Sequence, residues 1–175
     1  MKKDFVMPIL VLAVICIVVS GALALLYNAT YPVIALRASE RTEAARIELI
    51  PQAAGFERIQ PDNLPGRITA AYRTVNDVGY IFIVTVMGYN GNIEIVCGID
   101  PDGNIIDTIV LSHSETPVLG TVAFEYAFAS QFVGRNNTDA TLHDIDTITG
   151  STITSTAYIN AVQYALDAYD IVKGG

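Results

Sequence analysis

The feature that most constrains this chain is an uncharged apolar segment near its N-terminus. The sequence contains no charged side chain between Asp4 and Arg37, and Phe5 to Tyr27 is apolar apart from a few small or polar residues. Because a helix of about 20 apolar residues crosses a bilayer, residues 5–27 are expected to form a transmembrane helix. Residues 1–4 are then a short N-terminal tail.

A cleaved signal peptide is the alternative interpretation of this segment, since Ala22-Leu23-Ala24 has the small-x-small pattern of a cleavage site. The apolar run is longer than a signal core of about 7–15 residues, which favours a retained anchor. Lys2 and Lys3 precede the run and acidic residues dominate after it, so the positive-inside rule predicts a cytoplasmic N-terminus. The chain is therefore expected to be a single-pass cell-membrane protein, with residues 28–175 outside the cytoplasm.

Composition and residue spacing argue against three kinds of site. The sequence has 10 basic and 18 acidic residues, a net charge of −8, and no basic cluster that could follow a phosphate backbone, so nucleic-acid binding is not expected. Cys16 and Cys97 lie far apart and have no C-x-x-C spacing. His113 and His143 stand in separate acidic segments, where solvated histidines are the commoner outcome. We expect neither a metal site nor a redox thiol pair.

The part after the span divides into a linking region, residues 28–66, and a domain, residues 67–175. In the linking region Ala38–Ile50 has the apolar spacing of an amphipathic helix, and turn formers fill the connector that follows it. In the domain, turn-forming residues separate segments rich in β-branched and aromatic side chains. Four antiparallel strands are expected, over Ile68–Thr74, Tyr80–Met87, Asn92–Ile99 and Ile105–Leu111.

Helices are expected on both sides of this sheet. Tyr80–Val86 is largely apolar on both alternating faces, which predicts a central strand that is covered on each side. Val122–Val133 is predicted to be helical, and Ile159, Val162 and Leu166 recur at helical spacing in the C-terminal segment. The expected fold class is α+β, with an N-terminal transmembrane helix followed by an antiparallel sheet flanked by helices.

Two polar segments, His113–Gly120 and Asp146–Thr156, flank the first of these helices. The second is rich in serine and threonine and directly precedes a helix. A helix N-terminus offers free backbone N–H groups and the positive end of the helix dipole, and Gly150 allows close backbone approach, so a phosphate could bind there. Alternatively, Thr154 or Ser155 is simply the N-cap of the helix.

Three motifs in these regions resemble motifs of FMN-binding domains and occur in the same order. Asp146-x-x-Thr149-Gly150-Ser151-Thr152 resembles the D-x-x-[ST]-G-A-T motif, whose final threonine carries FMN through a phosphoester. Glu115-Thr116-Pro117-x-Leu119-Gly120 is similar to the E-T-P-G-L-G loop, and Gly88-Tyr89-x-Gly91 matches the glycine-rich strand turn. Over residues 5–172 the chain resembles the FMN-binding G subunit of Rnf complexes, which are ion-translocating ferredoxin:NAD oxidoreductases, and the related C subunit of the sodium-pumping NADH:quinone oxidoreductase.

The resemblance implies a membrane-anchored electron carrier with covalent FMN, working inside an ion-translocating complex and having no catalytic site of its own. Its partners would be the other membrane subunits and a flavin transferase that attaches the FMN. A covalent link prevents loss of flavin from a solvent-exposed carrier and leaves the ring free to exchange electrons. The residues then expected to bind the cofactor are Thr152 (covalently), Asp146, Thr149, Gly150, Ser151, Thr154, Glu115, Thr116, Leu119, Gly120, His113 and Tyr89.

Three residues depart from the family pattern. Ser151 replaces the usual alanine, and Val118 and Asn90 each replace a glycine. Ser151 adds a competing hydroxyl beside the acceptor, and Val118 lacks the access to positive φ that glycine has. Two alternatives to the Rnf-type carrier remain. One is a stand-alone membrane-anchored flavoprotein for extracytoplasmic electron transfer, and the other is a non-redox binding domain on a membrane stalk.

Overall fold

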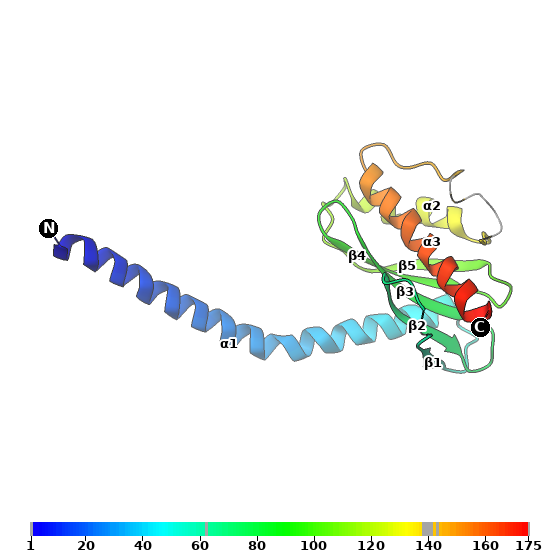
Figure 1. The fold of residues 1–175 in the computed structure, drawn as a ribbon, viewed down its shortest axis with the longest axis horizontal. Helices are drawn as coiled ribbons and strands as arrows, with labels where there is room; N and C mark the ends of the chain where they lie inside the picture. The colour runs from blue at the N-terminus through cyan, green and yellow to red at the C-terminus, as the bar shows by residue number, and fades with distance from the viewer. Residues whose placement is uncertain (1, 62, 138–141, 143, 175) are drawn as a thin grey trace. The chain divides into compact units, whose positions relative to one another are not determined.

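The computed structural model describes residues 2–61, 63–137, 142 and 144–174. The chain forms two compact units, Met1–Arg41 and Thr42–Gly175. Helix α1 (Lys2–Leu49) begins in the first unit and ends in the second, which also contains the sheet and the other helices (Figure 1). The second unit thus begins within α1 and includes residues 42–66 of the predicted linking region.

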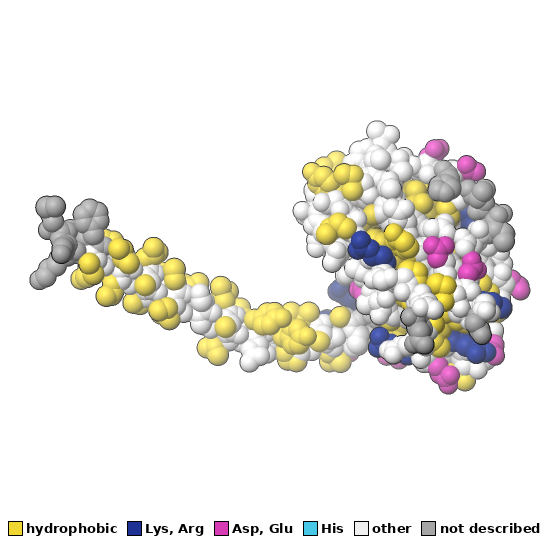
Figure 2. Space-filling model, viewed as in Figure 1, with side chains coloured by type: hydrophobic (Ala, Val, Ile, Leu, Met, Phe, Trp, Pro, Cys, Tyr) yellow, Lys and Arg dark blue, Asp and Glu magenta, His cyan; other side chains and the backbone are white. Residues whose placement is uncertain are grey.

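Helix α1 has the properties of a single-pass membrane anchor. Its large apolar side chains over residues 6–36 are exposed (Figure 2), and in the described part of the chain it is the one helix long and apolar enough to cross a membrane. The sequence predicted one helix at 5–27 and another from Ala38, whereas α1 is continuous, even through Pro32. Helical bonding satisfies the backbone polar groups of an apolar segment, which is why residues 28–37 also remain helical.

The sheet is a meander in which each strand pairs antiparallel with the next along the chain. Over the residues that the structure describes, it has five strands, so the prediction of four is wrong by one. The additional strand lies inside the predicted connector, and it pairs through Phe56 opposite Thr74 and Ile59 opposite Ala71. The strands are β1 (Phe56–Ile59), β2 (Ile68–Thr74), β3 (Tyr80–Met87), β4 (Asn92–Ile99) and β5 (Ile105–Ser112).

Both faces of the sheet are covered, and the side chains of β3 alternate between the two covers. Phe82 belongs to the larger core cluster, together with Leu166 of helix α3 (Thr152–Gly174). Ile81 belongs to the smaller cluster on the other face, together with Leu49 at the end of α1. All four of these side chains are buried, which confirms the prediction of a central strand covered on each side.

The region predicted as one helix over 122–133 is helical in three short pieces. Glu125 has an extended conformation (φ −71°, ψ 148°) that interrupts the helical path. With this break, the rings of Phe128 and Phe132 pack against Tyr158 of α3, at centroid distances of 5.6 and 5.3 Å. The pieces are η1 (Thr121–Phe124), α2 (Tyr126–Ala129) and η2 (Ser130–Phe132).

Candidate functional site

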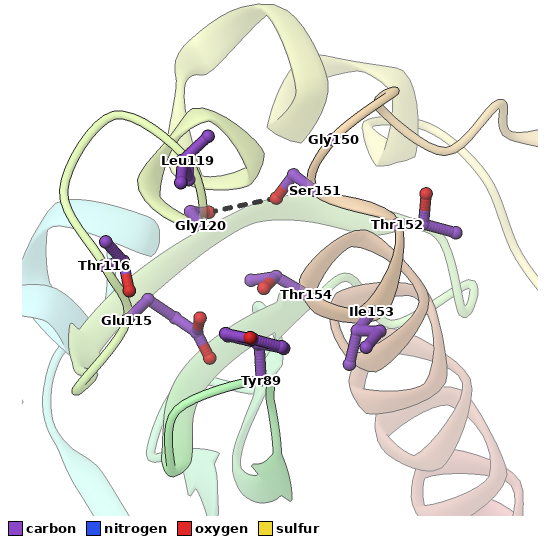
Figure 3. A pocket seen from close by; sticks show the side chains of 10 residues that line it. All are labelled: Tyr89, Glu115, Thr116, Leu119, Gly120, Gly150, Ser151, Thr152, Ile153 and Thr154. Carbon is purple, nitrogen blue, oxygen red and sulfur yellow. Dashed lines mark hydrogen bonds between the residues drawn. The ribbon is translucent and has the colours of Figure 1, made fainter.

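Three segments that are distant in the sequence surround a cavity of about 370 Å³ (Figure 3). One is the turn between β3 and β4, the second is the loop after β5, and the third is the start of α3. These segments carry the three motifs found in the sequence. The cavity is lined by Tyr89, Glu115, Thr116, Leu119, Gly120, Gly150, Ser151, Thr152, Ile153 and Thr154.

The start of α3 presents backbone donors beside this cavity. Gly150 has φ +85°, a left-handed conformation that favours glycine, and it turns the chain into the helix. The Ser155 N–H donates to the Ser151 carbonyl at 2.8 Å, so the helical bonding pattern begins there. The N–H groups of residues 152–154 precede this pattern and have no helical acceptor. Together with the helix dipole, they favour an anionic group at this end of the helix.

The hydroxyl groups at the start of α3 differ in accessibility. Ser151, Thr154 and Ser155 are buried, whereas Thr152, the first helical residue, is exposed. The Ser151 hydroxyl donates to the Gly120 carbonyl at 3.3 Å, which joins two of the motif segments. The interpretation of Thr154 or Ser155 as the N-cap is wrong, because the helix begins before both of them. Thr152 is therefore the most accessible of these four hydroxyls.

Glu115 occupies a slot that two glycines create. Its side chain is 5% exposed, and its Oε1 accepts a hydrogen bond from the Asn90 N–H at 3.2 Å. A Cβ atom at Gly120 would lie 2.6 Å from Glu115 Oε2, and one at Gly88 would collide with Oε1. The glycine-rich turn and the 115–120 loop thus have a shared requirement, which is to leave room for one carboxylate.

The departures from the family pattern have identifiable structural consequences. Asn90 ties the two loops together, since its Nδ2 donates to the Ser114 carbonyl at 2.8 Å. Val118 has φ +70°, the region that the sequence analysis identified as suited to glycine. For a β-branched residue this conformation costs about 1–2 kcal/mol, which makes the 115–120 loop a strained segment.

Exposed apolar side chains form the outer edge of the cavity. Tyr89 is 71% exposed, Leu119 is 62% exposed and Ile153 is 56% exposed. Figure 3 shows Tyr89 next to Glu115, with Ile153 at the start of α3. Ile153 was not predicted as a site residue, although its position next to Thr152 on a predicted helix could have suggested it. These side chains offer apolar surface to a flat aromatic group.

The cavity brings together most of the predicted binding residues. Asp146 and Thr149 precede α3 and are outside the lining of the cavity. His113 also lies outside it, with its ring 4.8 Å from that of Phe124 in a separate hollow. The predicted residues in the lining are Tyr89, Glu115, Thr116, Leu119, Gly120, Gly150, Ser151, Thr152 and Thr154.

The charges around the cavity suit an organic ligand better than a metal. Glu115 is the one charged side chain among the lining residues, and none of them is a histidine or a cysteine. Over the described residues, no group of three or more His, Cys, Asp or Glu side chains is placed to hold a metal ion. His143, the second histidine considered from the sequence, lies outside the described residues.

Comparison with known proteins identifies the family of the domain that contains the cavity. The FMN-binding domain family matches residues 88–167, a range that contains all of the lining residues. The chain is 32% identical to the G subunit of the ion-translocating oxidoreductase complex of Methanosarcina acetivorans, over 99% of this chain and 98% of that protein. The chain belongs to this G-subunit family. The match includes α1, so the family relationship covers the anchor as well as the domain.

Other members of the G-subunit family are similar over most of their length. The G subunit of the proton-translocating ferredoxin:NAD(+) oxidoreductase complex of Clostridium ljungdahlii is 29% identical, over 94% of this chain and 91% of that protein. The corresponding subunit of the Na(+)-translocating complex of Acetobacterium woodii is also 29% identical, over 91% of this chain and 89% of that protein. The chain thus has an N-terminal apolar helix and an FMN-binding domain, as the sequence predicted.

Proposed function

We propose that this protein carries FMN covalently on Thr152 and passes electrons within an Rnf-type, ion-translocating ferredoxin:NAD oxidoreductase complex. The observation that carries the proposal is the exposed Thr152 hydroxyl at the start of α3, on the border of the cavity. FMN supplies one- and two-electron redox chemistry, while the protein holds and orients it. The similar proteins of Clostridium ljungdahlii and Acetobacterium woodii are named as G subunits of such complexes.

The lining residues fit FMN in three respects. The free N–H groups at the start of α3 suit a phosphate, and no acidic side chain among the lining residues belongs to that segment. Tyr89, Leu119 and Ile153 offer apolar surface to the isoalloxazine ring. The buried Glu115 carboxylate offers an acceptor to N–H or O–H donors of the flavin.

Attachment requires an activated flavin and an enzyme that delivers it. The Thr152 oxygen would attack the phosphorus that is attached to the flavin moiety of a dinucleotide joined by a pyrophosphate. The new bond joins that oxygen to this phosphorus, and the pyrophosphate P–O bond breaks. The hydroxyl proton is lost, and the other half of the dinucleotide leaves as a nucleoside monophosphate. A flavin transferase is the partner proposed for this step.

The intact mass of the purified protein tests the covalent link. We expect a mass increase equal to one FMN less one water, and a flavin absorbance that remains with the protein after acid precipitation. Non-covalent FMN would be released by acid, and the mass would equal that of the polypeptide. Co-purification of the other membrane subunits should accompany the flavin, and a flavin-loaded chain found always alone would support the stand-alone flavoprotein instead.

We also propose that the N-terminus is cytoplasmic and that the FMN-binding domain is extracytoplasmic. Lys2 and Lys3 precede the apolar run, and positive residues are retained on the cytoplasmic side of a span. Protease added to sealed, right-side-out cells should therefore digest the domain after α1. An intact domain in those cells, with digestion only after the membrane is opened, would reverse the proposed orientation.

A further inference from the structure

Glu115 contains a buried polar atom that the protein does not satisfy. Over the described residues, its Oε2 is the one buried side-chain oxygen or nitrogen that lacks a hydrogen-bond partner. Its other oxygen, Oε1, already holds the Asn90 N–H. A buried acceptor without a partner destabilises the fold, so the hydrogen bond that Oε1 accepts does not explain why this position has a carboxylate with a second oxygen.

The surroundings of the Glu115 side chain indicate which kind of group could satisfy Oε2. Glu115 lines the cavity, and Figure 3 shows its carboxylate beside the Tyr89 side chain, across the cavity from Gly150 and Thr152. A carboxylate accepts hydrogen bonds and, when ionised, donates none. A phosphate group at this position would be repelled by the carboxylate, whereas an N–H group would be bound.

Resting on the function proposed above, we propose that Glu115 Oε2 accepts a hydrogen bond from the ring N–H that the isoalloxazine already carries in its oxidised state, and that the carboxylate lowers the reduction potential of the flavin. The phosphate then lies at the start of α3, and the ring reaches toward Glu115. Tyr89, 71% exposed beside the carboxylate, supplies a flat apolar surface for the ring. A negative charge next to the ring opposes the addition of electrons, and its effect is large because burial limits screening by solvent.

The two glycines that border Glu115 support a precise position for this carboxylate. Gly120 lies closest to Oε2, and Gly88 to Oε1. The E-T-P-x-L-G motif thus contains both Glu115, which supplies the acceptor, and Gly120, whose missing side chain leaves room for it. A carboxylate needed only to hold the Asn90 N–H would require no free second oxygen.

The test is Glu115→Gln in the full-length, flavin-loaded protein, with the reduction potential measured by spectroelectrochemical titration. Glutamine keeps an oxygen for the Asn90 N–H, removes the charge and places an amide donor at Oε2. We expect a shift of the potential to more positive values at unchanged flavin occupancy. The matched control is Glu125→Gln, which removes the same charge from an exposed position and should leave the potential unchanged.

Gly120→Ala is the second variant, because it retains the charge but displaces Oε2. It should shift the potential in the same direction by a smaller amount. Wild-type potentials in both variants, or a folded Glu115→Gln protein that takes up no flavin, would overturn the inference. Wild-type protein without flavin would instead show that the proposed function has failed, so the two failures are distinguishable.

Discussion

Replacement of Thr152 by valine is expected to abolish the FMN adduct while leaving the fold intact. Valine keeps the β-branched shape and removes only the hydroxyl oxygen that would form the phosphoester. Because Thr152 is exposed at the first position of α3, the substitution should change the free energy of unfolding by no more than about 0.5 kcal/mol. Intact mass spectrometry of the full-length protein should find the polypeptide mass alone, and electron transfer by the complex should be lost.

Two matched substitutions separate this effect from a general loss of hydroxyl groups. Thr156→Val removes an exposed threonine hydroxyl one turn further along α3, and it should retain the adduct. Ser151→Ala restores the residue usual in the family and should also retain it, at the cost of the hydrogen bond to the Gly120 carbonyl. Full flavin occupancy on Thr152→Val protein, located by peptide mapping on a neighbouring hydroxyl, would contradict the assignment.

The sheet was largely predictable because its strands are long and separated by strong turn signals. The bounds of β2, β3 and β4 agree with the predicted ranges, and β5 extends one residue further, to Ser112. Strand β1 was missed because it has only four residues and lies among glycines and prolines, which resemble a loop. Its stability comes from pairing with β2, and pairing between strands is not encoded in local propensity.

The sequence predicted that these segments are helical, but it did not predict where each helix begins and ends. The predicted helix over Ala38–Ile50 ends within one residue of the end of α1, at Leu49. The apolar periodicity of 122–133 indicates burial, but it does not show that Glu125 is extended and divides the segment. The division depends on how Phe128 and Phe132 pack around Tyr158, which is a tertiary effect.

The sequence predicted which residues belong to the candidate site, but it did not predict how they are arranged in space. Motif resemblance identified Glu115 and Gly120, but it gave no reason for their spacing, which the Cβ contact at Gly120 now supplies. His113 was included because it adjoins a motif, yet strand β5 ends just before it, and its ring lies beside Phe124, outside the cavity. Two residues of the attachment motif, Asp146 and Thr149, also lie outside the lining, so a motif in the sequence does not by itself show which of its side chains border the cavity.

The domain is also expected to lose stability steeply in alkaline solution, because two buried acids become harder to ionise on folding. Burial, and then the negative charge of Asp107, raise the pKa of the Cys97 thiol from 9.0 to about 12. Burial also raises the pKa of Tyr158 above its ordinary value, and a hydrogen bond with Thr108 opposes the rise. Both groups therefore keep their protons to a higher pH in the folded chain than in the unfolded chain.

The sign of the effect follows from this difference. Below the unfolded pKa values both states are protonated, so the free energy of unfolding is unaffected there. Above about pH 9 for the thiol and about pH 10 for the phenol, the unfolded chain releases protons that the folded chain still binds. The free energy of unfolding then falls by about 1.4 kcal/mol per pH unit for each group. The loss from Cys97 should continue until the pH approaches 12, its folded pKa.

Urea unfolding between about pH 7 and 11, followed by circular dichroism in detergent, measures this dependence. Cys97→Ala should remove the decrease in the free energy of unfolding that begins at about pH 9. Tyr158→Phe should remove the decrease that begins at about pH 10. Both expectations concern the slope with pH and not the stability at neutral pH. Tyr126→Phe is the control, since Tyr126 is 79% exposed, and it should keep the wild-type slope. Equal slopes in the wild type and in both core variants would mean that neither buried acid causes the alkaline loss of stability.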